Sequence, residues 1–194
     1  MNLRYRLLLL LMAFTCTVVS AQTYDMLIKG GRLIDPKNDI DATMDIAIKD
    51  GKVAKVAKSI AGSDASKVID ADGLVVAPGL IDIHGHVFHG TKPNHYLSDG
   101  LTALPPDGFT FRVGVTTIVD CGGAGWKNFE TFKKNVIEPS KTRVLSFMNI
   151  VGEGMRGGAW EQNTSDMDGK LSGIVAKQNK QYVVGFKVAH YGSR

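Results

Sequence analysis

Cysteine, clustered basic residues and long apolar runs are all scarce in this 194-residue chain. Two cysteines, Cys16 and Cys121, cannot form the disulfide framework of a small secreted domain. No basic cluster is interleaved with aromatic residues, and the formal net charge is only +4, so nucleic acid is not an expected partner. With 44% hydrophobic and 22% charged residues, the composition is ordinary and excludes a disordered tail, a fibrous repeat and a polytopic membrane protein.

The first 21 residues have the organisation of a secretory signal peptide. Arg4 and Arg6 precede an apolar run, Leu7 to Phe14, which is too short to span a bilayer. Small residues at positions 19–21 then provide a cleavage site, so the mature chain is predicted to start at Gln22. A membrane anchor or a core strand is the alternative interpretation of this segment.

Cleavage at that site changes the expectations for the remaining chain. The loss of Arg4 and Arg6 lowers the formal net charge from +4 to +2, and Cys121 remains as the single cysteine. We therefore expect an exported protein, periplasmic or secreted, with no intrachain disulfide and no stable membrane insertion.

Residues 22–78 alternate short apolar strands with glycine turns, at Gly30-Gly31, at Asp50-Gly51 and at Asp72-Gly73. An Asp-Gly pair between apolar strands predicts a type I′ hairpin, because both central residues need a positive φ. The third turn is expected to join another pair of strands. So few strands form only a small sheet, which must pack against something else.

Residues 79–194 alternate apolar strands with helical segments, a pattern typical of parallel β/α units. A helix is expected around Phe129 to Ile137, ended by Pro139, and another around Leu171 to Gln178, with Asp168 as its N-cap. Pro106 is expected to open a short helix that ends near Val113. The four predicted strands are Leu80–His86, Val115–Asp120, Arg143–Val151 and Val183–Ala189.

His84 and His86 stand two residues apart in the first of these strands. Side chains at i and i+2 of a strand point to the same face, so both imidazoles project together. Imidazole is a common ligand for Zn²⁺, although two histidines in a strand can also be simple surface polarity.

Three segments of the chain resemble the amidohydrolase superfamily of metal-dependent hydrolases. They are VVAPGLIDIHGH (75–86), GVTTIVD (114–120) and VVGFK (183–187). The resemblance implies an α/β fold: a partial (β/α)8 TIM barrel of about four strands over residues 79–194, preceded by a small β-sandwich segment over residues 22–78. It also implies that His84 and His86 bind metal, with Zn²⁺ expected and another divalent ion as the alternative.

Lys187 is the other residue to which the resemblance gives a role. A lysine inside an apolar strand is costly to bury as a cation, which favours the neutral amine that reacts with CO₂. The resemblance implies a carboxylated Lys187 that bridges two metal ions. The alternative is a lysine near the strand end whose amine reaches water.

The remaining candidates stay outside this metal set of His84, His86 and Lys187. His89 is a candidate for the substrate entrance, His95 lies in a polar loop, and His190 belongs to the strand end of Lys187. Cys121 is either a small packing residue or a metal bridge, as in some D-aminoacylase-like relatives. The residues after the third strand, Asn149, Glu153 and Arg156, either contact substrate or belong to a solvated loop.

The resemblance implies hydrolysis of an amide or ester of a small acylated amino or hydroxy acid, as in deacetylases, by metal-activated water. Alternatives are a D-aminoacylase- or dihydroorotase-type hydrolase of cyclic or acyl amides, or a truncated non-catalytic fragment. The superfamily pattern needs two further histidines and an aspartate beyond Lys187, and a full barrel needs about 250 residues. We therefore expect the first half of an enzyme with a small-molecule substrate, whose oligomeric state and substrate the sequence leaves open.

Overall fold

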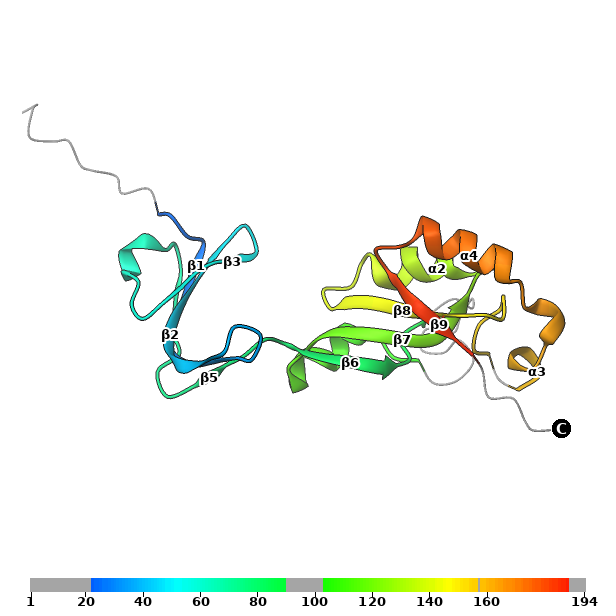
Figure 1. The fold of residues 1–194 in the computed structure, drawn as a ribbon, viewed down its shortest axis with the longest axis horizontal. Coiled ribbons are helices and arrows are strands. Elements are labelled where there is room, and N and C mark those ends of the chain that lie inside the picture. Colours follow the sequence, from blue (N-terminus) through cyan, green and yellow to red (C-terminus); the bar gives the residue numbers. More distant parts are fainter. Residues whose placement is uncertain (1–21, 90–102, 157, 189–194) are drawn as a thin grey trace, which may run out of the picture. The chain divides into compact units, whose positions relative to one another are not determined.

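The computed structural model describes residues 22–89, 103–156 and 158–188. The chain divides between Pro78 and Gly79 into two compact units, each with its own sheet (Figure 1). None of the helices within these ranges has the length and apolar character needed to cross a membrane.

The first unit is a five-stranded sheet in the order β3-β2-β1-β4, with β5 also paired to β1. Neighbouring strands β1, β2 and β3 are antiparallel, whereas β4 and β5 run parallel to β1. The elements are β1 (Met26–Asp35), β2 (Ile40–Lys49), β3 (Lys52–Ala57), the 3-10 helix η1 (Gly62–Asp64), β4 (Val68–Asp70) and β5 (Val75–Val76).

The hairpin predicted at Asp50-Gly51 is confirmed. Strands β2 and β3 pair antiparallel on either side of it, with φ values of 50° at Asp50 and 69° at Gly51. Both central residues therefore have the positive φ that a type I′ turn requires.

The turn predicted at Gly30-Gly31 is wrong, because β1 runs straight through this pair. The register with β2 shifts between Ile28 and Gly31, which marks a β-bulge. The carboxylate of Asp45 in β2 accepts a hydrogen bond of 2.8 Å from the Gly30 N–H. A contact to the neighbouring strand therefore holds the extra residue in the sheet.

The strand pair predicted around Asp72-Gly73 is also wrong, because β4 and β5 do not pair with each other. Both lie along one edge of β1, where the Ala71 N–H donates to Lys29 O (2.8 Å) and the Arg32 N–H donates to Leu74 O (2.9 Å). The open edge of β1 thus provides backbone hydrogen-bond partners first for the β4 segment and then for the β5 segment.

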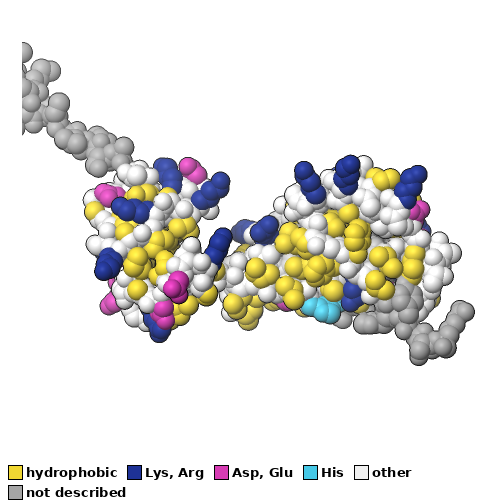
Figure 2. Space-filling view, viewed as in Figure 1, with side chains coloured by type: hydrophobic (Ala, Val, Ile, Leu, Met, Phe, Trp, Pro, Cys, Tyr) yellow, Lys and Arg dark blue, Asp and Glu magenta, His cyan; other side chains and the backbone are white. Residues whose placement is uncertain are grey.

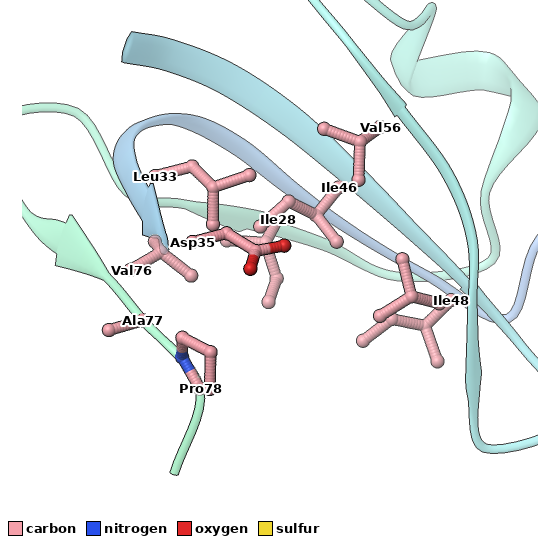
Figure 3. A pocket seen from close by; sticks show the side chains of 10 residues that line it. Ile28, Leu33, Asp35, Ile46, Ile48, Val56, Val76, Ala77 and Pro78 are labelled. Atoms are coloured by element: carbon pink, nitrogen blue, oxygen red, sulfur yellow. The ribbon is translucent and has the colours of Figure 1, made fainter. Parts of the chain in front are cut away.

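The two faces of this sheet differ in what covers them. On one face, a small buried core forms around Leu27, Ala47, Ile60 and Ala65. The other face holds a shallow apolar pocket, shown in Figure 3, with the Asp35 carboxylate among its lining residues. Its other labelled residues are Ile28, Leu33, Ile46, Ile48, Val56, Val76, Ala77 and Pro78.

The second unit contains a four-stranded parallel sheet in the order β6-β7-β8-β9, which confirms the predicted β/α alternation. The strands are β6 (Leu80–Gly85), β7 (Val115–Gly125), β8 (Arg143–Asn149) and β9 (Val183–Lys187). The helical elements are η2 (Pro106–Gly108), η3 (Thr110–Val113), α2 (Phe129–Phe132), the π-helical turn η4 (Lys133–Ile137), α3 (Gly158–Glu161), η5 (Thr164–Asp166) and α4 (Gly169–Gln178).

Helical segments cover one face of this sheet (Figure 1). Phe132 of α2 packs against Phe129 and Phe88, with ring centroids 6.1 and 4.8 Å away, in a core that also holds Ile118 of β7 and Met148 of β8. The N-cap predicted for the last helix is confirmed, since the Asp168 carboxylate accepts from the Leu171 N–H at 2.8 Å.

The outer strands β6 and β9 keep large apolar side chains in solvent. Ile83 of β6 is 66% exposed and Phe186 of β9 is 50% exposed. Hydrophobic side chains accordingly gather over the strands of the second unit in Figure 2.

The buried Asp45 is expected to contribute to the stability of the first unit. Its buried carboxylate accepts from Lys29 Nζ (2.9 Å), from the Gly30 N–H (2.8 Å) and from the Ile60 N–H (2.8 Å). Burial alone would raise the pKa of Asp45, but these hydrogen bonds outweigh it and hold the pKa below its ordinary value. We expect Asp45→Asn to lower the free energy of unfolding by about 1–3 kcal/mol, measured by urea denaturation.

Asp41→Asn is the matched control, because Asp41 lies on the same strand in an exposed ion pair with Arg32 and should change stability little. A group with a lowered pKa stabilises the fold fully above its unfolded value of about 3.9 and loses that effect as the pH falls further. The difference between wild type and Asp45→Asn should therefore be constant above about pH 5 and shrink below pH 4. Equal effects of the two substitutions would contradict the role given to Asp45.

Candidate metal centre

The parallel register brings the carboxyl ends of β6, β7, β8 and β9 to one edge of the sheet. Gly85 lies opposite Asp120, which in turn lies opposite Ser146. Further along the same edge, Asn149 lies opposite Lys187. In parallel β/α folds, this edge is where functional side chains meet.

His84 and His86 project from the end of β6, with ring centroids 5.7 Å apart and ring planes at 79°. His84 is exposed and His86 is half-buried. Histidine side chains reach the surface of the second unit in Figure 2. Gly85 between them passes so close to β7 that a Cβ would lie 2.5 Å from Ile118 Cδ1, so the two histidines flank a position that must stay small.

The surroundings of His86 favour its neutral form. Burial lowers the pKa of His86 below its ordinary value. The Asp120 carboxylate opposes this shift, whereas His84 and Lys187 add to it. Because metals bind the neutral imidazole, this setting is suited to a metal ligand.

Asp120, the last residue of the VTTIVD segment, is the main residue that the sequence reasoning missed. Its side chain is fully buried, and its Oδ2 accepts from the Val87 N–H (2.8 Å) and the Phe88 N–H (3.2 Å). Its Oδ1 accepts from the Gly123 N–H at 2.6 Å. Burial raises the pKa of Asp120, against the effect of these donors and of His86.

Lys187, at the end of β9, is partly buried and close enough to act electrostatically on His86. Its side chain crosses Gly122, where a Cβ would lie 2.6 Å from Lys187 Cγ. The fully buried Asn149 fixes this loop, since its Nδ2 donates to Gly122 O (3.2 Å) and its Oδ1 accepts from the Val151 N–H (3.0 Å). Gly122 and Asn149 thus shape the surface along which the Lys187 side chain lies.

The other candidates have different positions. His89 is half-buried, with its Nδ1 2.8 Å from the carbonyl oxygen of Val87. Cys121 is buried within β7 as a free thiol. His95 and His190 lie outside the described residues.

Glu153 and Arg156 belong to an ionic network that joins the loop after β8 to the end of β7. Lys127 Nζ contacts Asp166 Oδ1 (2.5 Å) and Glu153 Oε1 (3.5 Å), and Arg156 lies 3.8 Å from Glu153. These ion pairs give both side chains a partner within the loop region after β8. A second carboxylate that the sequence did not predict, Glu161 of α3, is buried and also acts electrostatically on His86.

The donor set fits part of a divalent metal site. Two imidazoles and a lysine lie at the carboxyl edge of one sheet, and the neutral state favoured for His86 is the ligating one. Within residues 22–89, 103–156 and 158–188, no three His, Cys, Asp or Glu side chains lie close enough to hold a metal ion. A lysine ligand or donors beyond the described residues are therefore needed to complete a site.

A parallel β/α sheet with polar groups at its carboxyl edge is shared by β/α barrels and doubly wound α/β folds. No family model matches the sequence. The chain is 32% identical over 154 residues to a deacetylase from Brucella anthropi, covering 76% of this chain and 36% of that protein. It is 41% identical over 87 residues to a dihydroorotase from Citrifermentans bemidjiense, covering 44% of this chain and 20% of that one.

Among solved structures, a dihydroorotase aligns with a TM-score of 0.70 at 27% identity, covering 85% of this chain and 42% of that one. The chain belongs to the amidohydrolase superfamily, and its second unit has part of the TIM-barrel fold of that superfamily. It spans well under half the length of these relatives.

The substitution Gly122→Ala tests whether the Lys187 side chain packs against Gly122. The φ of +87° at Gly122 and the close approach of Lys187 mean that Gly122→Ala must both strain the backbone and displace the lysine. Gly114→Ala is the control in the same unit, because Gly114 has a φ of +75° but no side-chain neighbour closer than 4.0 Å. We expect the control to lose about 1 kcal/mol in denaturant unfolding and Gly122→Ala to lose clearly more. Equal losses would contradict the close packing of Lys187 on Gly122.

Proposed function

We propose that this chain contributes to the catalytic centre of a metal-dependent hydrolase that cleaves the amide or ester bond of a small acylated substrate. His84, His86 and a carboxylated Lys187 are the proposed ligands, and two Zn²⁺ ions are the proposed metals. The predicted signal peptide favours an exported enzyme, periplasmic or secreted. The small-molecule substrate is its proposed partner.

The observation that carries this proposal is the pair of imidazoles at the end of β6, with Lys187 at the end of β9 on the same edge of the sheet. A histidine whose pKa is lowered by burial, at the carboxyl edge of a parallel sheet, is typical of a functional site. The relatives named deacetylase and dihydroorotase support a hydrolase of this kind.

When bound, a divalent metal would polarise the carbonyl of the substrate and lower the pKa of a water molecule. The chain itself contributes orientation. Gly85 lets the His84 and His86 backbone lie against β7, and the side chain of Asp82 accepts from the His84 N–H at 2.9 Å. Both contacts fix the strand end from which the imidazoles project.

Lys187 is proposed to act as a carbamate. The neutral Nζ amine attacks the carbon of CO₂, a new N–C bond forms, one C–O π bond opens onto oxygen, and the amine loses a proton to water. The product is an anion with two oxygens, able to serve two cations at once. Gly122, over which the lysine side chain lies, and the buried Asn149 that bonds to it would hold this group in place.

The metal content of Lys187→Ala tests the proposal most simply. We expect the purified wild-type protein to hold two metal ions per chain after loading with Zn²⁺, and Lys187→Ala to hold one or none. Lys177→Ala is the matched control, since Lys177 is an exposed lysine in the last turn of α4 and should retain both ions. Two ions retained by Lys187→Ala would refute the bridging role.

The substrate class remains divided between acyl groups and cyclic amides, because the relatives bear both kinds of name. We favour the acyl class, since the deacetylase matches 76% of this chain and the dihydroorotase 44%. With the zinc-loaded full-length enzyme that contains this chain, N-acetyl amino acids and O-acetyl hydroxy acids should release acetate faster than dihydroorotate or hydantoins open. A reversed preference would transfer the assignment to the cyclic-amide class.

A further inference from the structure

The buried carboxylate of Asp120 joins two segments of the proposed metal centre. On one side it accepts from the Val87 and Phe88 N–H groups, directly after His86. On the other it accepts from the Gly123 N–H, directly after the glycine that Lys187 crosses. We propose that Asp120 is a positioning residue that fixes the His86 segment and the Gly122 loop relative to each other. This inference rests on the proposed function.

The His86 side of this contact depends on an interaction between strands. Val87 and Phe88 lie two and three residues beyond Gly85, the last residue of β6, so their N–H groups have left the ladder of the sheet. Both donors converge on Oδ2 of Asp120, at 2.8 and 3.2 Å, and the side chains of Val87 and Phe88 are buried. The backbone that follows His86 is therefore fixed to β7, which fixes the point from which the imidazole projects.

On the Lys187 side, the Asp120 carboxylate lies equally close to the backbone of the Gly122 loop. Gly123 N donates to Oδ1 at 2.6 Å, and a Cβ on Gly123 would lie 2.7 Å from that oxygen. The neighbouring Gly122 lies beneath the Lys187 side chain. A shift of the Asp120 carboxylate thus moves the surface on which the proposed bridging group rests.

A carboxylate is the side chain that these donors require. Three N–H groups approach two oxygens, and a buried carboxyl group is tolerable only when it is hydrogen-bonded in this way. Asparagine has nearly the same shape but one acceptor oxygen, so its NH₂ would face a backbone donor. Asp120→Asn therefore tests the contact with a minimal change of volume.

The experiment measures the dissociation constant for Zn²⁺ by competition with a fluorescent chelator, using the purified full chain. We expect Asp120→Asn to weaken binding about 10–100-fold, the usual effect of losing a group that orients metal ligands. Asp107→Asn is the matched control. Asp107 also accepts from two backbone N–H groups, those of Lys141 and Thr142 (both 2.8 Å), but at the opposite end of β8.

The control separates positioning from general destabilisation. Both substitutions should lower the free energy of unfolding of the metal-free protein, but Asp107→Asn should change the Zn²⁺ constant less than twofold. If Asp120→Asn does not fold, Gly123→Ala provides the same test, because its Cβ displaces the carboxylate while keeping the charge. This variant should also weaken Zn²⁺ binding.

The outcomes are distinguishable. Wild-type binding with an unchanged constant in Asp120→Asn, or in Gly123→Ala where that variant stands in, would overturn the positioning role and leave the proposed function intact. An equal weakening of Zn²⁺ binding in Asp107→Asn would show that Asp120 has only a structural role. No Zn²⁺ binding by the wild-type protein would overturn both the proposed function and this inference.

Discussion

The parallel register of β6, β7, β8 and β9 is the constraint on which the candidate site depends. Because all four strands run the same way, residues from distant parts of the sequence reach one edge, with Gly85 opposite Asp120 and Asn149 opposite Lys187. A slip of one residue would turn each side chain to the other face of the sheet. Gly85 and Gly122 at this edge lie against the side chains of Ile118 and Lys187, so this register requires a small residue at both positions.

Aspartates that accept backbone N–H groups recur in both units, buried at Asp45 and Asp120 and exposed at Asp107. Asp45 joins the bulge of β1 to Ile60, Asp107 joins η2 to the start of β8, and Asp120 joins the ends of β6 and β7. Each carboxylate accepts N–H groups that lie outside the regular ladder of the sheets. The three sites differ in what lies beside them, and only Asp120 borders the histidines at the edge of the sheet.

The sequence predicted features whose signal is local, and it failed where the cause lies elsewhere in the chain. The Asp50-Gly51 hairpin and the Asp168 cap follow from neighbouring residues, and the four strands follow from apolar runs. The bulge at Gly30 was missed because its hydrogen-bond partner, Asp45, lies on another strand. Asp120 was missed as a functional candidate because its donors Val87 and Phe88 lie more than 30 residues away.

The central claim, that the end of β6 and Lys187 together hold metal, is tested most directly by locating the metal. Crystals of the protein grown with Zn²⁺ and measured at the zinc absorption edge would give an anomalous difference map. The account predicts peaks within about 2.0–2.2 Å of a nitrogen of His84 or His86 and of a carbamate oxygen on Lys187. Zinc bound only elsewhere, with an unmodified Lys187 amine and both imidazoles unliganded, would contradict it.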